Sequence, residues 1–339
     1  MAVSLRRSAL FCLLTVACGT GTEPGTGTDW IDASVSFQDS AIVVERVSYR
    51  SDGLVVTGQP CRPADNSRHP VVIFAHGGWE GLGTELDPTA SFCSALARYG
   101  TVVVEPSYRG EDGSEGNIEL CQGETHDLAQ MLTLVRAHPY ADTTSLHALG
   151  GSHGGCILLR ALAEGLPVTR AVVLYPAVVW TEIYDSLTAR FPTATPTQQA
   201  GYQYLLDGLT RYLGGTPTPP PAAYAARDLT PLAAVLAAWP GKLLLLHGVD
   251  DDIVPAVQSC RLADQMGGFL AYHVQPDSTT SATAPPPCAG GAQSWRTDVI
   301  PLGSWPAARY LIEYDSVDHS GGTLRPLLDG HALDFLYAP

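Results

Sequence analysis

The stretch that most constrains the fold is Gly150-Gly151-Ser152-His153-Gly154, which has the pattern G-x-S-x-G. In this pattern a serine lies at a sharp turn between a strand and a helix. The apolar segment before it predicts a short buried strand, and the segment after it predicts a helix. The turn is so tight that a Cβ atom at Gly150 or Gly154 would collide with the neighbouring strand or helix. We therefore interpret Ser152 as a nucleophile rather than as a helix-capping serine.

Apolar runs and helical patterns alternate along most of the chain. Apolar-rich segments predict buried strands at residues 71–75, 101–105, 145–149, 171–175, 243–247 and 310–314. The run at 71–75 is continuously apolar, as expected of a strand covered on both faces. Helical spacing of apolar residues is found over 88–99, 125–138, 156–163 and 323–337, and residues 42–49 and 54–61 predict an antiparallel hairpin. This alternation predicts an α/β fold with a mostly parallel sheet and helices on both faces.

Two long segments interrupt the alternation. Residues 181–225 are rich in Pro, Thr and aromatic residues, and their place in the chain predicts a lid-like insertion over Ser152. Residues 276–306 form a second insertion with little periodicity. Insertions this long in a compact α/β domain are usually functional or disordered. We predict a single catalytic domain over residues 30–339.

A serine hydroxyl near pH 7 needs a base to take its proton and an acid to orient that base. In parallel sheets, functional loops lie beyond the carboxyl ends of the strands. His319 lies in such a loop after the last strand, whereas His331 lies inside the closing helix, so we predict His319 as the base. Three consecutive aspartates, residues 250–252, follow the strand before it and compete for the role of the acid. The order serine, acid, histidine is the one that this kind of hydrolase requires.

A resemblance to a known family separates the three aspartates. His247-Gly248-x-x-Asp251-x-x-Val254-Pro255 resembles the acid loop of the prolyl-oligopeptidase family and its dienelactone-hydrolase relatives. In that resemblance the catalytic aspartate aligns with Asp251. The carboxylates on either side of it are then expected to be solvated or to cap the loop.

The serine motif together with Tyr108-Arg109-Gly110 is similar to the acylaminoacyl-peptidase branch of the same family. The resemblance extends over roughly residues 45–339 and implies the α/β-hydrolase fold, an acyl-enzyme intermediate and no metal or organic cofactor. One departure stands out: a short hairpin region takes the place of the N-terminal β-propeller of that branch.

The oxyanion hole is also expected from this resemblance. His76-Gly77-Gly78-Trp79 resembles the HGG loop of the family, which implies a backbone N–H donor at Gly78 or Trp79. The second donor is expected to be the backbone N–H of His153, directly after the nucleophile. Two such donors stabilise the developing oxyanion by several kcal/mol in related chemistry.

Three functions remain open at this point. The motifs favour a prolyl-oligopeptidase-type peptidase on short peptides. The replaced propeller and the aromatic insertion favour a carboxylesterase on apolar acyl esters. A non-catalytic surface binding module on a hydrolase scaffold is the alternative of another class.

A weaker hypothesis is that Glu111, Asp112 and Glu115 attract a substrate amine. A solvated acidic turn is the simpler interpretation of these residues.

The first residues are typical of export. Arg6 and Arg7 precede a short apolar run, and small residues lead to Cys18, so residues 1–18 resemble a lipoprotein signal with Cys18 as the lipidated residue. Residues 19–29 are rich in Gly and Thr and predict a flexible linker. We expect a bacterial cell-envelope lipoprotein, or otherwise a periplasmic or secreted protein.

The net charge restricts the classes of partner that the protein can bind. Loss of two arginines with the signal takes the formal net charge from −15 to −17, which argues against nucleic acid and anionic membrane surfaces. We therefore expect a small peptide or ester as the partner, and contact with a membrane only through the lipid anchor.

No zinc-type spacing of cysteine and histidine is present. Six of the eight cysteines remain beyond Cys18 and predict disulfides; proximity suggests Cys93 with Cys121 and Cys260 with Cys288.

Overall fold

The computed structural model describes residues 29–80, 92–219, 221–275, 294–319 and 325–339, without the side chains of residues 294 and 325–329. The predicted signal, the lipidation site Cys18 and nearly all of the linker lie outside these residues. Within them, no helix is long and apolar enough to cross a membrane.

One sheet of eleven strands organises the described residues, in the order β1-β2-β3-β5-β4-β6-β7-β8-β11-β9-β10. The neighbours from β1 to β5 pair antiparallel, and all later pairs are parallel. The strands are β1 (Asp32–Gln38), β2 (Ile42–Ser51), β3 (Leu54–Pro63), β4 (His69–Ala75), β5 (Val102–Pro106), β6 (Ala141–Gly151), β7 (Arg170–Leu174), β8 (Lys242–Gly248), β9 (Leu270–Val274), β10 (Ser294–Arg296) and β11 (Arg309–Tyr314).

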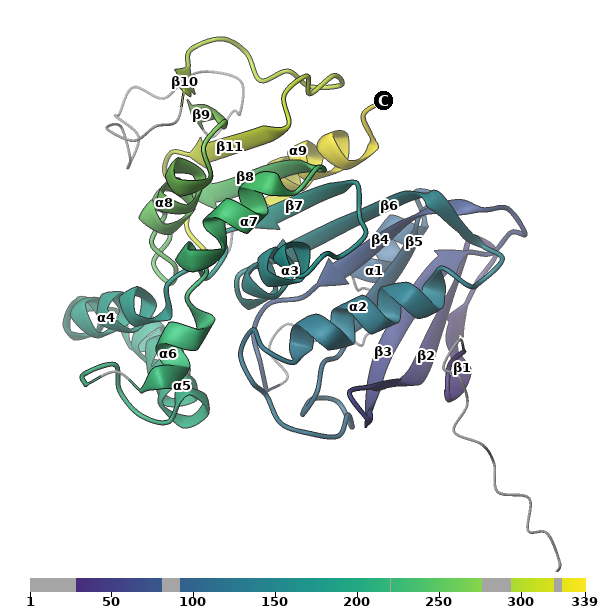
Figure 1. Cartoon of the computed structure of the whole chain (residues 1–339), viewed down its shortest axis with the longest axis horizontal. Coiled ribbons are helices and arrows are strands. Elements are labelled where there is room, and N and C mark those ends of the chain that lie inside the picture. The colour runs from purple at the N-terminus through teal and green to yellow at the C-terminus, as the bar shows by residue number, and fades with distance from the viewer. Residues whose placement is uncertain (1–28, 81–91, 220, 276–293, 320–324) are drawn as a thin grey trace, which may run out of the picture.

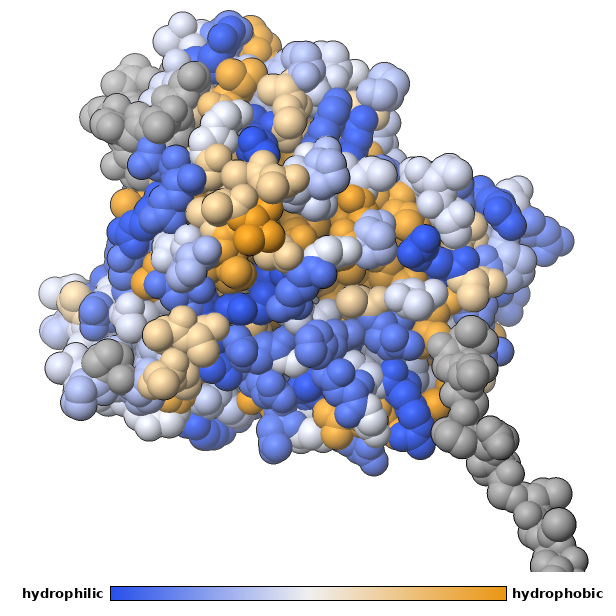
Figure 2. All heavy atoms as spheres, in the orientation of Figure 1, coloured by the Kyte–Doolittle hydropathy of each residue, from blue (hydrophilic) through white to orange (hydrophobic). Residues whose placement is uncertain are grey.

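Helices cover both faces of this sheet (Figure 1). One face carries α1 (Phe92–Ala97) and α9 (Arg325–Tyr337), and the other carries α2 (Glu124–Val135), α3 (His153–Ala163), α7 (Ala233–Ala238) and α8 (Val257–Met266). The predicted α/β-hydrolase architecture, a mostly parallel sheet with helices on both faces, is confirmed. Apolar side chains gather around α7 on the face shown in Figure 2, where Val235 is exposed.

Three helices project beyond the carboxyl ends of the strands and form what we call the cap: α4 (Trp180–Arg190), α5 (Pro196–Leu213) and α6 (Ala222–Arg227) (Figure 1). The cap coincides with the predicted insertion over residues 181–225. Its longest helix, α5, begins with a capping box in which Thr195 and Gln198 exchange hydrogen bonds, and it ends at the left-handed Gly214.

Three strands were not predicted from the sequence: β1, β9 and β10. They lie toward the two edges of the sheet, where short or half-exposed segments give a weak apolar pattern. Part of the second predicted insertion, residues 276–293, lies outside the described residues, and β10 follows it directly.

The disulfides correct one prediction. Cys93 pairs with Cys61 rather than with Cys121, because α1 packs on β3 and brings their Cα atoms to 5.7 Å. Cys121 pairs with Cys156 on α3, with the Cα atoms 5.9 Å apart. The predicted partner of Cys260, Cys288, lies outside the described residues, so that pairing stays a prediction.

Candidate active site

The turn between β6 and α3 holds Ser152 in a strained backbone conformation, with φ 55° and ψ −122°. Such strain persists only where the surroundings fix the chain, and here they do. A Cβ atom on Gly154 would lie 2.0 Å from the carbonyl oxygen of Ala75, and one on Gly150 would lie 2.7 Å from that of Gly154. The predicted reason for both glycines is confirmed.

Three predicted side chains meet at this turn. The Ser152 hydroxyl donates to His319 Nε2 over 3.0 Å, and His319 Nδ1–H donates to Asp251 Oδ2 over 2.7 Å. They come from the turn after β6, the loop after β11 and the loop after β8. The His319 side chain is 20% exposed, so it contacts both the buried acid and solvent.

Asp251 is a buried carboxylate whose oxygens are all engaged. Oδ1 accepts the backbone N–H groups of Ile253 and Val254, at 2.9 and 2.7 Å. Oδ2 also lies 3.3 Å from Nε2 of the buried His247. Burial raises the pKa of Asp251, but the charge of His319 and the hydrogen bonds from both histidines outweigh it and hold that pKa well below the usual range.

The rival residues lie elsewhere. Asp250 is exposed, and Asp252 accepts a hydrogen bond from Tyr202 of the cap at 2.8 Å. His331 is buried against the hydroxyl of Tyr314, and burial lowers its pKa to about 4. The structure therefore brings Asp251 and His319 to Ser152 and leaves these other candidates away from it.

The loop that carries two of the predicted oxyanion residues packs against Ser152, since a Cβ atom on Gly77 would lie 3.1 Å from Ser152 Cβ. His153 begins α3, and its buried side chain donates from Nδ1 to the carbonyl of Gly78 over 2.9 Å. Burial lowers the pKa of His153 to about 4, so this ring is neutral near pH 7. Among the described residues, no acceptor is found for the backbone N–H groups of Gly78, Trp79 and His153. Their role as oxyanion donors stays a prediction.

The cap closes over this site through contacts that the sequence did not reveal. Tyr204 on α5 donates to the carbonyl of Trp79 over 2.5 Å, and Arg211 and Tyr212 contact Glu80. Gly208 allows α5 to lie directly on the Trp79 ring, because a Cβ atom there would be 2.5 Å from Trp79 Nε1. The aromatic content of this insertion was visible in the sequence, but its partners were not.

A small pocket opens beside Ser152 between the sheet and the cap. Its lining is aromatic and aliphatic: Trp79, His153, Ala177, Trp180, Ile183, Leu205, Leu209, Ile253 and Val254, together with Ser152 itself. Among these described residues none is charged near pH 7, since His153 is neutral. The arrangement can therefore hold an apolar group next to a nucleophile and an oxyanion site.

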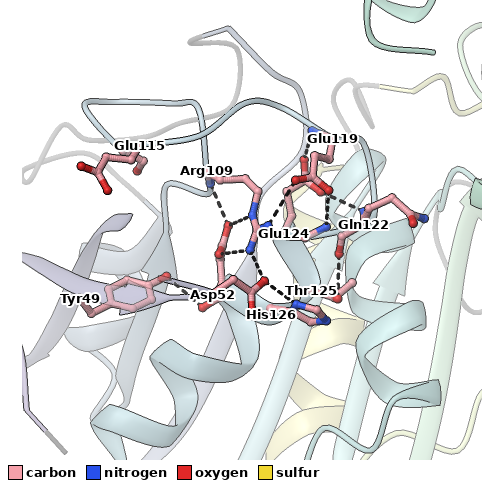
Figure 3. A network of polar contacts seen from close by, with 12 residues as sticks. Tyr49, Asp52, Arg109, Glu115, Glu119, Gln122, Glu124, Thr125 and His126 are labelled. Atoms are coloured by element: carbon pink, nitrogen blue, oxygen red, sulfur yellow. Dashed lines mark hydrogen bonds and ion pairs between the residues drawn. The ribbon is translucent and has the colours of Figure 1, made fainter. Parts of the chain in front are cut away.

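Arg109 of the Tyr108-Arg109-Gly110 motif belongs to a separate polar network (Figure 3), whereas the Tyr108 hydroxyl donates to the carbonyl of His76 over 3.4 Å. Arg109 binds both carboxylate oxygens of Asp127 and also contacts Asp52 and Glu119. Near it, Glu115 accepts the backbone N–H of Val55 at 2.8 Å. None of the residues 111, 112 and 115 lines the pocket beside Ser152, so the geometry gives no support to the substrate-amine hypothesis.

The sheet, the strained serine turn at its carboxyl edge and the cap together define a serine hydrolase of the α/β-hydrolase fold. Acetyl xylan esterase 1 from Thermoanaerobacterium sp. has the same fold, with a TM-score of 0.57 and 16% identity over 91% of this chain and 87% of that chain. A sequence profile of the prolyl oligopeptidase family matches residues 89–278, more than half of the chain. The chain belongs to the prolyl oligopeptidase family.

Two further proteins are similar to this chain. The uncharacterized peptidase YtmA of Bacillus subtilis (strain 168) is 27% identical over 221 residues, which are 65% of this chain and 78% of that protein. The acylaminoacyl peptidase of Pyrococcus horikoshii has a TM-score of 0.56 and 16% identity over 86% of this chain, but this chain spans only 40% of its length. The predicted family resemblance is confirmed.

Proposed function

We propose that the protein is an exported serine peptidase that cleaves short peptides through an acyl-enzyme intermediate. The observation that carries this proposal is the hydrogen-bond chain from Asp251 through His319 to the Ser152 hydroxyl. Family membership and the likeness to a protein named as a peptidase support the choice of an amide bond.

In this mechanism His319 Nε2 takes the proton of Ser152 as Oγ attacks the carbonyl carbon. Asp251, charged because its pKa is low, stabilises the imidazolium that forms. The backbone N–H of His153, with that of Gly78 or Trp79, binds the oxyanion. His319 then protonates the leaving amine, and water, activated by the same imidazole, releases the acyl group from Ser152.

The second candidate is a carboxylesterase on apolar acyl esters. The specific observation that favours it is the small pocket, whose described lining residues include no charged side chain to bind a peptide terminus. An esterase from Pyrococcus furiosus also matches over nearly its whole length, with 89% of that chain covered at a TM-score of 0.56 and 13% identity. That likeness shows only the shared fold, so the esterase proposal rests on the pocket.

Parallel profiling decides between the two. Aminoacyl p-nitroanilides and p-nitrophenyl acyl esters are offered to the wild type and to Ser152→Ala. Turnover of both kinds, lost in the variant, is expected of a peptidase, because esters are the easier substrates. Turnover of esters alone would contradict the peptidase proposal and support the esterase. Turnover of neither would favour the non-catalytic binding module.

Export with lipid anchoring at Cys18 is the remaining part of the proposal. The two disulfides support an oxidising compartment. The test is fractionation of bacterial cells that express the full chain. The wild type is expected with the membranes, and Cys18→Ser is expected to leave them. A wild type in the soluble cytosolic fraction would contradict export.

A further inference from the structure

The pocket beside Ser152 lies on the acyl side of the bond that would be cleaved. It is lined by Ser152 and by the oxyanion residues Trp79 and His153, which an acyl carbonyl must contact. His319, which would protonate the leaving group, does not line it. Under the proposed function, therefore, the acyl chain enters this pocket and the leaving group lies on the side of His319.

The space available there is small. The cavity measures about 20 Å³, close to the minimum that one water molecule needs. A second, open groove lies next to it, lined by Gln198, Gly201, Tyr202, Tyr204, Leu205, Asp252 and Ile253, and measures about 460 Å³. Leu205 and Ile253 line both spaces, so these two side chains form the wall between them.

The walls of the small pocket are fixed by hydrogen bonds. The buried Gln258 on α8 binds the two residues that precede α4. Its side chain accepts the backbone N–H groups of Val178 and Val179 and donates to the carbonyl of Val179, over 2.8 to 3.0 Å. This bond set holds the segment that carries Trp180. On the acid loop, Asp252 is bound by Tyr202 of α5.

The oxyanion loop is held in the same way, by Tyr204 on the carbonyl of Trp79 and by the close contact of Gly208 with the Trp79 ring. Each element that lines the pocket is thus tied to a neighbour. Its small volume is therefore a built feature, since enlarging it requires breaking these bonds or moving a clamped ring.

We infer that the site selects a short apolar acyl group, about the size of acetyl or of an alanine residue, and that Leu205 is the residue that sets this limit. This inference rests on the proposed function and holds for an ester or an amide. A longer chain would have to pass the wall of Leu205 and Ile253 into the groove. Truncating Leu205 joins the two spaces and gives such a chain room.

The test is the ratio of kcat/KM for p-nitrophenyl acetate to that for p-nitrophenyl octanoate. It is measured for the wild type, Leu205→Ala and the matched control Leu206→Ala. Leu206 follows on the same helix, is half-buried like Leu205, and lines neither space. For amides, alanine and leucine p-nitroanilides replace the two esters. Thermal unfolding checks that each variant is folded, and Leu205→Val serves if the alanine variant is not.

The wild type is expected to prefer acetate by at least about 10-fold, because even one methylene that does not fit an apolar pocket costs that much. Leu205→Ala is expected to lower the ratio by about 10-fold or more, and Leu206→Ala to leave it within about twofold. Equal use of both esters by the wild type, or equal effects of the two variants, would overturn the inference and leave the proposed function intact. No turnover of any ester or amide, with no fluorophosphonate labelling, would overturn the proposed function itself.

Discussion

Two buried carboxylates in this molecule each accept several hydrogen bonds but have different roles. Asp251 receives two backbone N–H groups on Oδ1 and His319 on Oδ2. Asp127 receives Nε, Nη2 and the backbone N–H of Arg109, all within 3.1 Å. Both side chains are fully buried.

The difference lies in the partner. An imidazole can give and take a proton near pH 7, and His319 also contacts Ser152. A guanidinium cannot, because its ordinary pKa is already high. Burial lowers the pKa of Arg109, but the hydrogen bonds to Asp127 and Asp52 outweigh burial, so that the pKa of Arg109 lies above its ordinary value. The first acid therefore positions a reactive base. The second acid, on α2, holds Arg109. Arg109 in turn contacts Asp52 in the β2–β3 turn and Glu119 in the loop before α2 (Figure 3).

Replacement of the nucleophile should have the largest effect on rate. Ser152→Ala removes the attacking oxygen, and we expect kcat to fall by about 10⁴- to 10⁶-fold on any substrate the wild type cleaves. The melting temperature should stay within about 2 °C, because the variant keeps the Cβ atom and the tight turn. Steady-state kinetics and thermal unfolding measure the two. A large loss of stability with little loss of rate would contradict the role of Ser152.

Replacement of the acid should come next. Asp251→Asn keeps the shape but removes the charge that stabilises the imidazolium, so kcat should fall by about 10⁴-fold. Asp252→Asn is the matched control, since its carboxylate binds Tyr202 and Gln198 and not His319. We expect its kcat to change by less than about tenfold. If the two variants lose the same activity, the choice of Asp251 is wrong.

The structural acid should show the reverse pattern. Asp127→Asn leaves the buried Arg109 without its closest counter-charge, and loss of one partner of a buried pair typically costs about 3–5 kcal/mol. Urea unfolding should report this loss, while the folded fraction keeps kcat within about tenfold. A loss of kcat as large as that of Asp251→Asn, at unchanged stability, would erase the distinction between the two acids.

A third buried acid, Glu313, sharpens the comparison because no cationic side chain binds it among the described residues; its Oε1 lies 2.7 Å from Cys260 Sγ. Oε2 accepts no hydrogen bond from the described residues, and burial raises the pKa of Glu313 to about 8. His247 on β8 and His273 on β9 are its register neighbours across the sheet. The folded protein therefore keeps the Glu313 proton up to about pH 8, whereas the unfolded chain loses it near pH 4.5.

The sign of the pH effect follows from this difference. Between the two pKa values the unfolded state binds fewer protons, so wild-type stability falls as pH rises. Glu313→Gln removes that dependence and should be more stable than the wild type at pH 8, by a few kcal/mol at most, and about equal to it at pH 5. Urea unfolding at both values is the measurement. Parallel pH profiles for the two proteins would refute the raised pKa.

Local signals explain why most of the site could be predicted from the sequence. The glycines around Ser152 are required by a tight turn formed by a few consecutive residues. His319 and Asp251 follow strands that are rich in apolar residues. Parallel strands bring their carboxyl ends to one edge whatever lies between them in the chain. The spatial meeting of the three side chains thus follows from the fold class.

The remaining features depend on contacts between distant segments. The bonds from Tyr202 and Tyr204 to the site loops span 50 and 125 residues, and no local pattern encodes them. The Cys61–Cys93 pair depends on α1 packing on β3, which sequence proximity could not reveal. For α5, the Thr195 and Gln198 capping box was a usable signal for the start of the helix.

The most direct test of the central claim is mass-spectrometric mapping of the residue that a fluorophosphonate modifies. We predict stoichiometric modification of Ser152 in the wild type, and at least about 10³-fold slower modification in His319→Ala, because that variant has no base to activate the hydroxyl. Modification of another residue, or equal rates in the two proteins, would contradict a nucleophilic Ser152 activated by His319.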